Sequence, residues 1–147
     1  MVRRLLAAVA IVSGVGVAAA ACGDPSDLVS GNAFAVINVY GVVTTAGGDP
    51  VGFADVVGTG YFDRGCRGQP GSNFTVSTAS SAGSFAGAAG IGPVLPQNLP
   101  VEGCIKLYAF PPFGSSLGID SVYLDSLVLN DLVAADADTV EVNFILP

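Results

Sequence analysis

The sequence predicts an all-β domain, a two-sheet sandwich of about seven short strands. Beyond residue 32, runs of β-branched and aromatic residues alternate with clusters of glycine, proline, serine and aspartate, which is typical of many short strands. No window in this part of the chain has convincing helical periodicity. Residues 127–137 have the strongest, and it is weak. With the first 21 residues set aside as a leader, about 125 residues remain, enough for one domain with one hydrophobic core.

The first half of the domain is expected to hold four strands. Residues 33–43 form the first strand, and alternate residues face its inner side: Ile37, Val39, Gly41 and Val43. Residues 54–62 form the second strand. Residues 74–78 and 84–88 flank the tight segment 79–83 and are expected to pair as a hairpin.

The second half begins with a stretch that is rich in proline. Residues 90–100 contain three prolines, which cannot donate to a central ladder, so we expect a loop or a sheet edge. Residues 104–110 form a strand, and residues 121–129 form the next one. In the first of these two strands, Ile105, Leu107 and Ala109 face inward, whereas Lys106 and Tyr108 face outward.

The last segment, residues 139–146, has the clearest alternation in the chain. Its apolar side chains share one face: Val140, Val142, Phe144 and Leu146. Its polar side chains share the other: Thr139, Glu141 and Asn143. This pattern predicts one half-buried strand.

Residues 1–21 have the pattern of a cleaved export signal. Arg3 and Arg4 precede an apolar run of 17 residues that ends in small side chains. A transmembrane helix needs about 20 apolar residues. Because this run is shorter and contains serine and glycine, cleavage is favoured over retention as an anchor.

The expected cleavage site resembles the lipobox of bacterial lipoproteins. Small residues lead directly into Cys22 and Gly23 follows, although Ala19 stands where the lipobox usually has leucine. The resemblance implies a lipidated Cys22 (palmitate among its acyl chains), a tether of residues 22–32 and a domain of residues 33–147. It implies a lipid-anchored protein of the cell envelope, at the outer membrane or in the periplasm if the host has two membranes. The alternative is an ordinary secretory cleavage after Ala21 and a secreted protein.

The three cysteines agree with a lipidated Cys22. If Cys22 carries lipid, Cys66 and Cys104 remain as one pair in an oxidising compartment, where disulfides persist. Cys66 lies in a glycine-rich loop rather than an apolar strand, which favours a disulfide over two free thiols. Closing a loop of roughly 40 residues would contribute about 4 kcal/mol by restricting the unfolded chain.

The charge of the chain excludes one class of partner. From Cys22 onward there are three basic and twelve acidic residues, a formal charge of −9. Such a surface repels phosphate backbones, so nucleic acid is excluded as a natural partner. Anionic lipid head groups repel it as well, so we expect attachment to a membrane through the N-terminal lipid.

Several short motifs resemble the opening of carboxypeptidase regulatory-like domains. Residues 39–43 (VYGVV), 48–51 (GDPV) and 54–56 (ADV) follow that family's order of a strand with a central glycine, a Gly-x-Pro turn and a strand that starts with a buried alanine. Thr78, Gly83 and Phe85 approximate its later Thr-x-x-x-Gly-x-Phe motif, with one extra residue. The resemblance covers roughly residues 37–88 and implies an Ig-like, transthyretin-like sandwich that has no shared catalytic residues.

The residue types present argue against catalysis. The chain has no histidine, which excludes Ser-His-Asp and Cys-His machinery and His-ligated zinc. The available carboxylate pairs, Asp120 with Asp125 and Asp136 with Asp138, are expected to be turn and strand-edge residues. The acidic residues around Asp131 do not have the spacing of an EF-hand. We therefore expect a protein that is not an enzyme and has no catalytic residue, metal or cofactor.

Exposed aromatic residues are the candidate binding groups. The four tyrosines, Tyr40, Tyr61, Tyr108 and Tyr123, suit the wet face of a sandwich. The segment from Phe110 to Phe113 sets two phenylalanines beside rigid prolines, and we take it as the candidate binding loop. The sequence thus predicts a non-enzymatic, lipid-anchored envelope protein that binds or spaces other components, protein or polysaccharide. The alternative is a carbohydrate-binding or adhesion module that uses the exposed aromatic loop residues.

Overall fold

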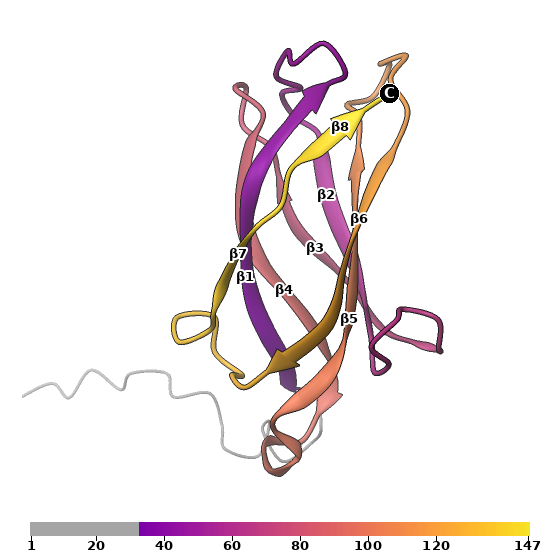
Figure 1. Ribbon diagram of the computed structural model, residues 1–147. Coiled ribbons are helices and arrows are strands. Elements are labelled where there is room, and N and C mark those ends of the chain that lie inside the picture. The colour runs from indigo at the N-terminus through magenta and orange to yellow at the C-terminus, as the bar shows by residue number, and fades with distance from the viewer. Residues whose placement is uncertain (1–32) are drawn as a thin grey trace, which may run out of the picture.

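The computed structural model of the chain describes residues 33–147, which form a β-sandwich of two four-stranded sheets (Figure 1). The strands are β1 (Ala33–Thr45), β2 (Asp55–Tyr61), β3 (Pro70–Thr78), β4 (Ser84–Val94), β5 (Val101–Phe110), β6 (Asp120–Leu129), β7 (Thr139–Glu141) and β8 (Phe144–Leu146). One 3-10 turn, η1 (Pro96–Asn98), precedes β5. The predicted all-β sandwich is confirmed, with eight strands where about seven are expected. The leader, the tether and Cys22 lie outside the described residues.

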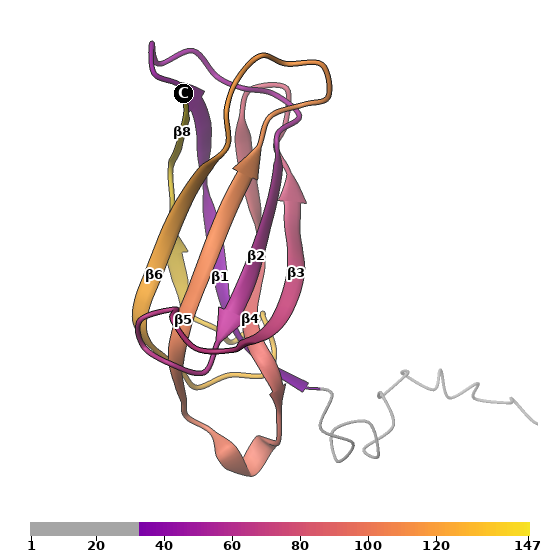
Figure 2. The ribbon, with the colours of Figure 1, turned by 90° about the vertical axis from the view of Figure 1, so that its right-hand side faces the viewer.

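The two sheets differ in how their strands pair. The sheet that we call the β1 sheet has the order β4-β1-β7, and β8 continues along β1 after β7. Here β1 pairs with β4 antiparallel and with β7 and β8 parallel. The second sheet, which we call the β5 sheet, has the order β3-β2-β5-β6 and is antiparallel throughout (Figure 2).

The core lies between the inner faces of the two sheets. The predicted alternation is confirmed in β5, where Ile105, Leu107 and Ala109 are fully buried and Lys106 and Tyr108 face outward. The largest fully buried side chains are Phe144, Ile91, Ile105, Leu107 and Leu146, contributed by three strands. Burial of one such side chain stabilises the fold by roughly 1.5–3 kcal/mol.

The predicted hairpin at residues 79–83 is wrong. β3 pairs with β2, and β4 pairs with β1, so this segment carries the chain from one sheet to the other. The turn itself is tight, because Ser80 and Ser84 bond across it and Gly83 takes a φ of +76°. Its residue types are those of a tight turn, and they are the same whether the two strands share a sheet or not.

The last predicted strand is interrupted between Glu141 and Phe144. The Val142 amide donates to the Tyr40 carbonyl at 2.8 Å, and the Val42 amide donates to the Asn143 side-chain oxygen at 3.0 Å. A Cβ on Gly41 would lie 1.7 Å from the Val142 carbonyl oxygen, so this close approach requires glycine. Val142, Phe144 and Leu146 still share the buried face, as predicted.

The proline-rich stretch is partly a sheet edge, one of its two predicted forms. β4 runs through Pro93 to Val94 and pairs with β1 on one side only. Proline is tolerated there because an edge strand has backbone groups outside the ladder.

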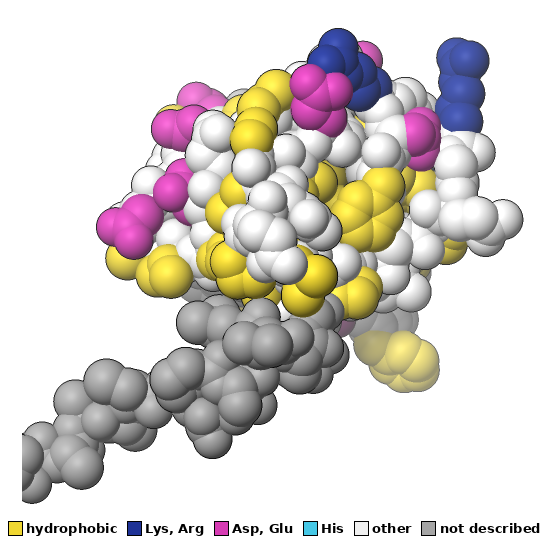
Figure 3. Space-filling view, turned by 90° about the horizontal axis from the view of Figure 1, so that it is seen from below, with side chains coloured by type: hydrophobic (Ala, Val, Ile, Leu, Met, Phe, Trp, Pro, Cys, Tyr) yellow, Lys and Arg dark blue, Asp and Glu magenta, His cyan; other side chains and the backbone are white. Residues whose placement is uncertain are grey.

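The elongated sandwich has two distinct ends. At one, which we call the entry end, lie Ala33 and the loops of residues 62–69, 95–100 and 130–138 (Figure 1). At the other, which we call the far end, lie Pro147 and the loops of residues 46–54, 79–83 and 111–119. Viewed from the entry end, hydrophobic side chains lie among polar ones, and acidic side chains lie toward the rim (Figure 3).

Candidate binding surface

The loop of residues 62–69 is fastened over the outer face of the β5 sheet. A disulfide joins Cys66 of this loop to Cys104 of β5, with the Cα atoms 5.2 Å apart, which confirms the predicted bridge. Cys104 occupies an outward position of β5 and is nevertheless fully buried. The loop therefore covers the half of this face that lies toward the entry end.

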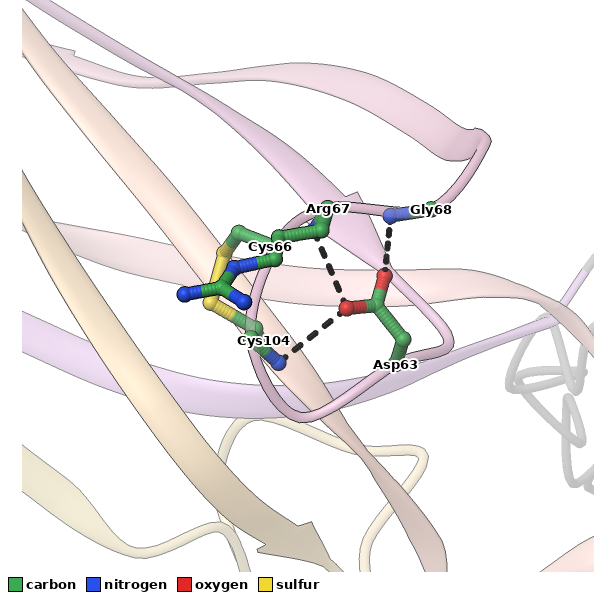
Figure 4. Close-up of a disulfide and its surroundings, with 6 residues drawn as sticks. Asp63, Cys66, Arg67, Gly68 and Cys104 are labelled. Atoms are coloured by element: carbon green, nitrogen blue, oxygen red, sulfur yellow. Dashed lines mark hydrogen bonds between the residues drawn. A yellow bond between two sulfur atoms is a disulfide. The ribbon is translucent and has the colours of Figure 1, made fainter.

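The carboxylate of Asp63 organises this loop (Figure 4). One of its oxygens accepts from the amides of Gly65 at 3.1 Å and Arg67 at 3.0 Å, and the other accepts from the amide of Gly68 at 2.7 Å. The amides of Arg67 and Gly68 lower the pKa of Asp63, because they stabilise its charged form. This network surrounds Cys66, whose φ of +53° is uncommon for a residue with a side chain.

Arg64 also holds the loop of residues 62–69 against the neighbouring strands. Its carbonyl accepts from the Ser126 amide of β6 at 3.1 Å, and its guanidinium bonds Glu102 of β5 at 3.0 Å. The loop thus reaches from β2 across β5 to β6, as Figure 2 shows.

The other half of the same face, toward the far end, is open and carries aromatic rings around one cation. The ammonium of Lys106 lies 4.7 Å from the centroid of the Tyr108 ring and 4.8 Å from that of Tyr123. Lys106 and Tyr123 are directly paired across β5 and β6. Tyr123 and then Tyr108 raise the pKa of Lys106 above its ordinary value, because their side chains favour the charged ammonium.

A groove of about 360 Å³ runs beside these rings over β2. Tyr108 and Phe110 form one wall, with ring centroids 6.2 Å apart and planes inclined by 35°. Asn73 and Thr75 of β3 form the other wall. The Thr59 hydroxyl lies 2.7 Å from the Asn73 side-chain oxygen, which leaves the amide nitrogen of Asn73 without an acceptor among the described residues.

The predicted aromatic residues do not form a single patch. Tyr108, Tyr123 and Phe110 come together on the β5 sheet, whereas Tyr40 lies on the β1 sheet. Phe110, the last residue of β5, is 38% exposed, and Phe113, in the loop beyond it at the far end, is fully exposed. The two phenylalanines of the predicted binding loop therefore differ: one is a wall of the groove, and the other projects from the end of the sandwich.

A second hollow, of about 650 Å³, lies on the outer face of the β1 sheet and reaches Ser77 and Thr78 of β3. Three of its polar side chains bond to one another: Glu141 bonds the Tyr40 hydroxyl at 3.5 Å and the Asn143 amide nitrogen at 3.0 Å. The Asn143 oxygen accepts from the Val42 amide. These polar groups are used in closing the interrupted last strand onto β1.

Of the carboxylates considered as acid–base pairs, Asp120 has a structural role. Asp120 accepts from the amides of Ser121 at 2.8 Å and Ile145 at 2.9 Å, and so joins β6 to β8. Asp125 lies five residues further along β6, which corresponds to about 17 Å of extended strand. Within residues 33–147, no group of three acidic or cysteine side chains is placed to hold a metal ion.

Sequence reasoning found the outward direction of Lys106 and Tyr108 but missed their partner. The available signal was the alternation of Lys106, Tyr108 and Phe110, which places three such side chains in a row. The pairing with Tyr123 depends on the register between β5 and β6, which is shifted between Gly103 and Ile105.

In the part of the chain that the structure describes, no helix has the length and apolar character needed to cross a membrane. In comparisons with known proteins, no family model matches the chain and no curated protein matches it in sequence.

Proposed function

We propose that the protein is a lipid-anchored, non-enzymatic module of the cell envelope, whose β-sandwich binds or spaces other envelope components. Lipid on Cys22 would hold it to the membrane, at the outer membrane or in the periplasm of a host with two membranes. The absence of histidine and the structural hydrogen bonds of Asp120 support a binding role over a catalytic one.

The observation that carries this proposal is that the chain enters the sandwich at one end and has an exposed aromatic loop at the opposite end. The chain enters at the end that holds Ala33, whereas the fully exposed Phe113 belongs to the loop at the other end. A tether of residues 22–32 reaches at most about 40 Å when extended. The 13 residues of β1 span about 44 Å. An anchor at Cys22 would therefore keep the entry end near the membrane and present the far end at a distance from it.

The resemblance to carboxypeptidase regulatory-like domains has support from three residues of its motifs. Ala54 is fully buried at the start of β2, and Phe85 is buried in β4. Gly83 has the positive φ that its turn requires. These residues support a regulatory-like sandwich and carry no catalytic role.

The intact mass of the protein, isolated from host membranes, tests the anchor. We expect a mass that corresponds to acylated Cys22, with two cysteines that are alkylated only after reduction. In Cys22→Ser, the protein is expected to leave the membrane fraction, whereas Cys66→Ser with Cys104→Ser retains it there. A mass that begins at Cys22 without lipid, or a Cys22→Ser protein that stays membrane-bound, would overturn the proposal.

A second candidate function is a carbohydrate-binding or adhesion module that uses Phe110 and Phe113. It is favoured by the ring pair of Phe110 with Tyr108 and by the full exposure of Phe113. The test is the affinity for envelope polysaccharide, which is expected to fall in Phe113→Ala. An unchanged affinity would remove the far-end loop from the binding site.

A further inference from the structure

We propose that the open half of the outer face of the β5 sheet binds an acidic polysaccharide. In this arrangement, the ammonium of Lys106 pairs with a sugar carboxylate, and Tyr108 stacks on a sugar ring. This proposal rests on the carbohydrate-binding function of the second candidate above, but it places the site at the open half of this face instead of at Phe113. It is independent of the lipid at Cys22.

The charge pattern of the face favours a ligand with a carboxylate. Among residues 33–147, the salt bridge formed is that of Arg64 with Glu102, and Lys106 has no carboxylate within 4 Å. Asp55, which is paired with Phe110 across the strands, accepts from the Thr78 hydroxyl at 2.7 Å and keeps its negative charge. Lys106 is thus a cation without an ion-pair partner among residues 33–147. The chain as a whole is strongly acidic and repels extended polyanions, so the attraction of Lys106 for a ligand carboxylate acts at short range.

The cation is also held in place. Its position over the Tyr108 and Tyr123 rings restrains a side chain that is usually mobile, and it leaves N–H donors directed away from the rings. A ligand carboxylate therefore meets an ammonium that has lost part of its conformational freedom before binding, which reduces the entropy cost of association.

The groove beside Lys106 has the chemistry of a sugar site. Its Tyr108 and Phe110 wall offers apolar ring surface, and its opposite wall offers the Asn73 amide and the Thr75 hydroxyl. A sugar has apolar C–H faces and a rim of hydroxyl groups, so it matches a site of mainly apolar surface with a few placed polar groups. Thr59 links Lys106 to the polar wall of the groove, because it is paired with Lys106 across the strands and bonds Asn73.

The same face suits a peptide strand poorly. Strand addition depends on the backbone groups of a free sheet edge. β2 and β5 carry the groove and most of the rings, and they are the two central strands of the sheet, with both edges paired. The hollow on the β1 sheet is a weaker candidate for an acidic sugar, because its charged group is the carboxylate of Glu141, which already bonds Tyr40 and Asn143.

The test is calorimetric binding of two probes of equal length to the full chain in detergent: an oligomer of galacturonic acid and its methyl ester. We expect the acidic oligomer to bind at least roughly tenfold more tightly than the ester. Lys106→Gln is expected to remove that difference while leaving the ester's affinity unchanged. Tyr108→Ala is expected to weaken both probes by at least roughly tenfold.

Two matched variants distinguish this face from the rest of the surface. Arg67→Gln removes one positive charge from the disulfide loop and is expected to leave both affinities unchanged. Phe113→Ala tests the far-end loop and is expected to leave them unchanged as well. Thermal unfolding of each variant verifies that it is folded, and Lys106 is sufficiently exposed for Lys106→Gln to fold normally.

Three results would overturn the proposal: binding of neither oligomer, equal binding of the acid and the ester, or an equal effect of Arg67→Gln and Lys106→Gln. Binding of envelope polysaccharide that is lost in Phe113→Ala and retained in Lys106→Gln would also overturn it. That last outcome would leave the carbohydrate-binding function intact and move it to the far-end loop.

Discussion

The two halves of the outer face of the β5 sheet follow the same alternation of side chains, but a loop covers one half and the other half is open to solvent. Toward the entry end, the outward residue Cys104 is fully buried under the loop of residues 62–69. Toward the far end, Tyr123 is 53% exposed, and no loop covers the groove beside Tyr108. The comparison shows that the alternation along a strand determines which side chains point outward. The disulfide-linked loop determines whether those side chains are exposed to solvent.

The largest expected effect comes from releasing the covered half. Replacement of both Cys66 and Cys104 by serine removes a bridge with a sequence separation of 38 residues. We expect a loss of about 4 kcal/mol in the free energy of unfolding, because the unfolded chain regains the entropy of the open loop. Urea unfolding of the two proteins measures it, with Cys22→Ser as the unaffected control. A loss below about 1 kcal/mol would show that the loop is held in place without the bridge.

A smaller effect is expected from Asp63→Asn, which keeps the shape of the side chain and removes its charge. The asparagine NH₂ group would face the Gly68 amide, so a donor would meet a donor where the carboxylate accepts at 2.7 Å. Since the pKa of Asp63 is lowered below 3.8 in the folded protein, its stabilisation is present above about pH 4 and is lost as the pH falls through the folded-state pKa.

The measurement for Asp63 is the thermal midpoint of both proteins across a pH series. We expect Asp63→Asn to unfold at a lower temperature at pH 7 and the two midpoints to converge as the pH falls through the lowered pKa of Asp63. A difference that stays constant down to pH 2 would mean that the charge of Asp63 does not fasten the loop.

The smallest expected effect is in the open half. Tyr123→Ala removes one of the two rings beside Lys106, and an exposed cation–π contact is worth about 0.5–1 kcal/mol. We expect a loss of stability of about 1 kcal/mol in the same urea experiment. A loss as large as that of the disulfide variant would show that the open half is structural and would erase the contrast between the halves.

Most of the sandwich could be predicted from the sequence because local patterns encode it. The alternation of Ile105, Leu107 and Ala109 with Lys106 and Tyr108 gives both faces of β5 directly. The crossing of residues 79–83 between sheets could not be predicted, because it depends on which strands pair at a distance. The interruption at Val142 could not be predicted either, since it results from the approach of a distant strand to Gly41.

The candidate site was less accessible from the sequence than the fold. Phe110 and Phe113 were visible as a pair of exposed aromatic residues, but the structure places them in different surroundings. The cluster around Lys106 draws on β5 and β6, and its groove also draws on β2 and β3. Three strand registers must be known before those side chains can be placed together.

The parallel pairing of β1 with β7 and β8 has a consequence for the order of folding. Asn38 of β1 bonds the carbonyl of Ala134, 96 residues later, and Val43 pairs with Phe144. While the chain is being made from its N-terminus, β1 has β4 on one side and a free edge on the other until the last residues arrive. We expect a chain shortened before Thr139 to expose that edge and to self-associate, because an uncovered strand edge is a template for another chain. The two short strands β7 and β8 thus cover the edge of β1 that is left open until they are made.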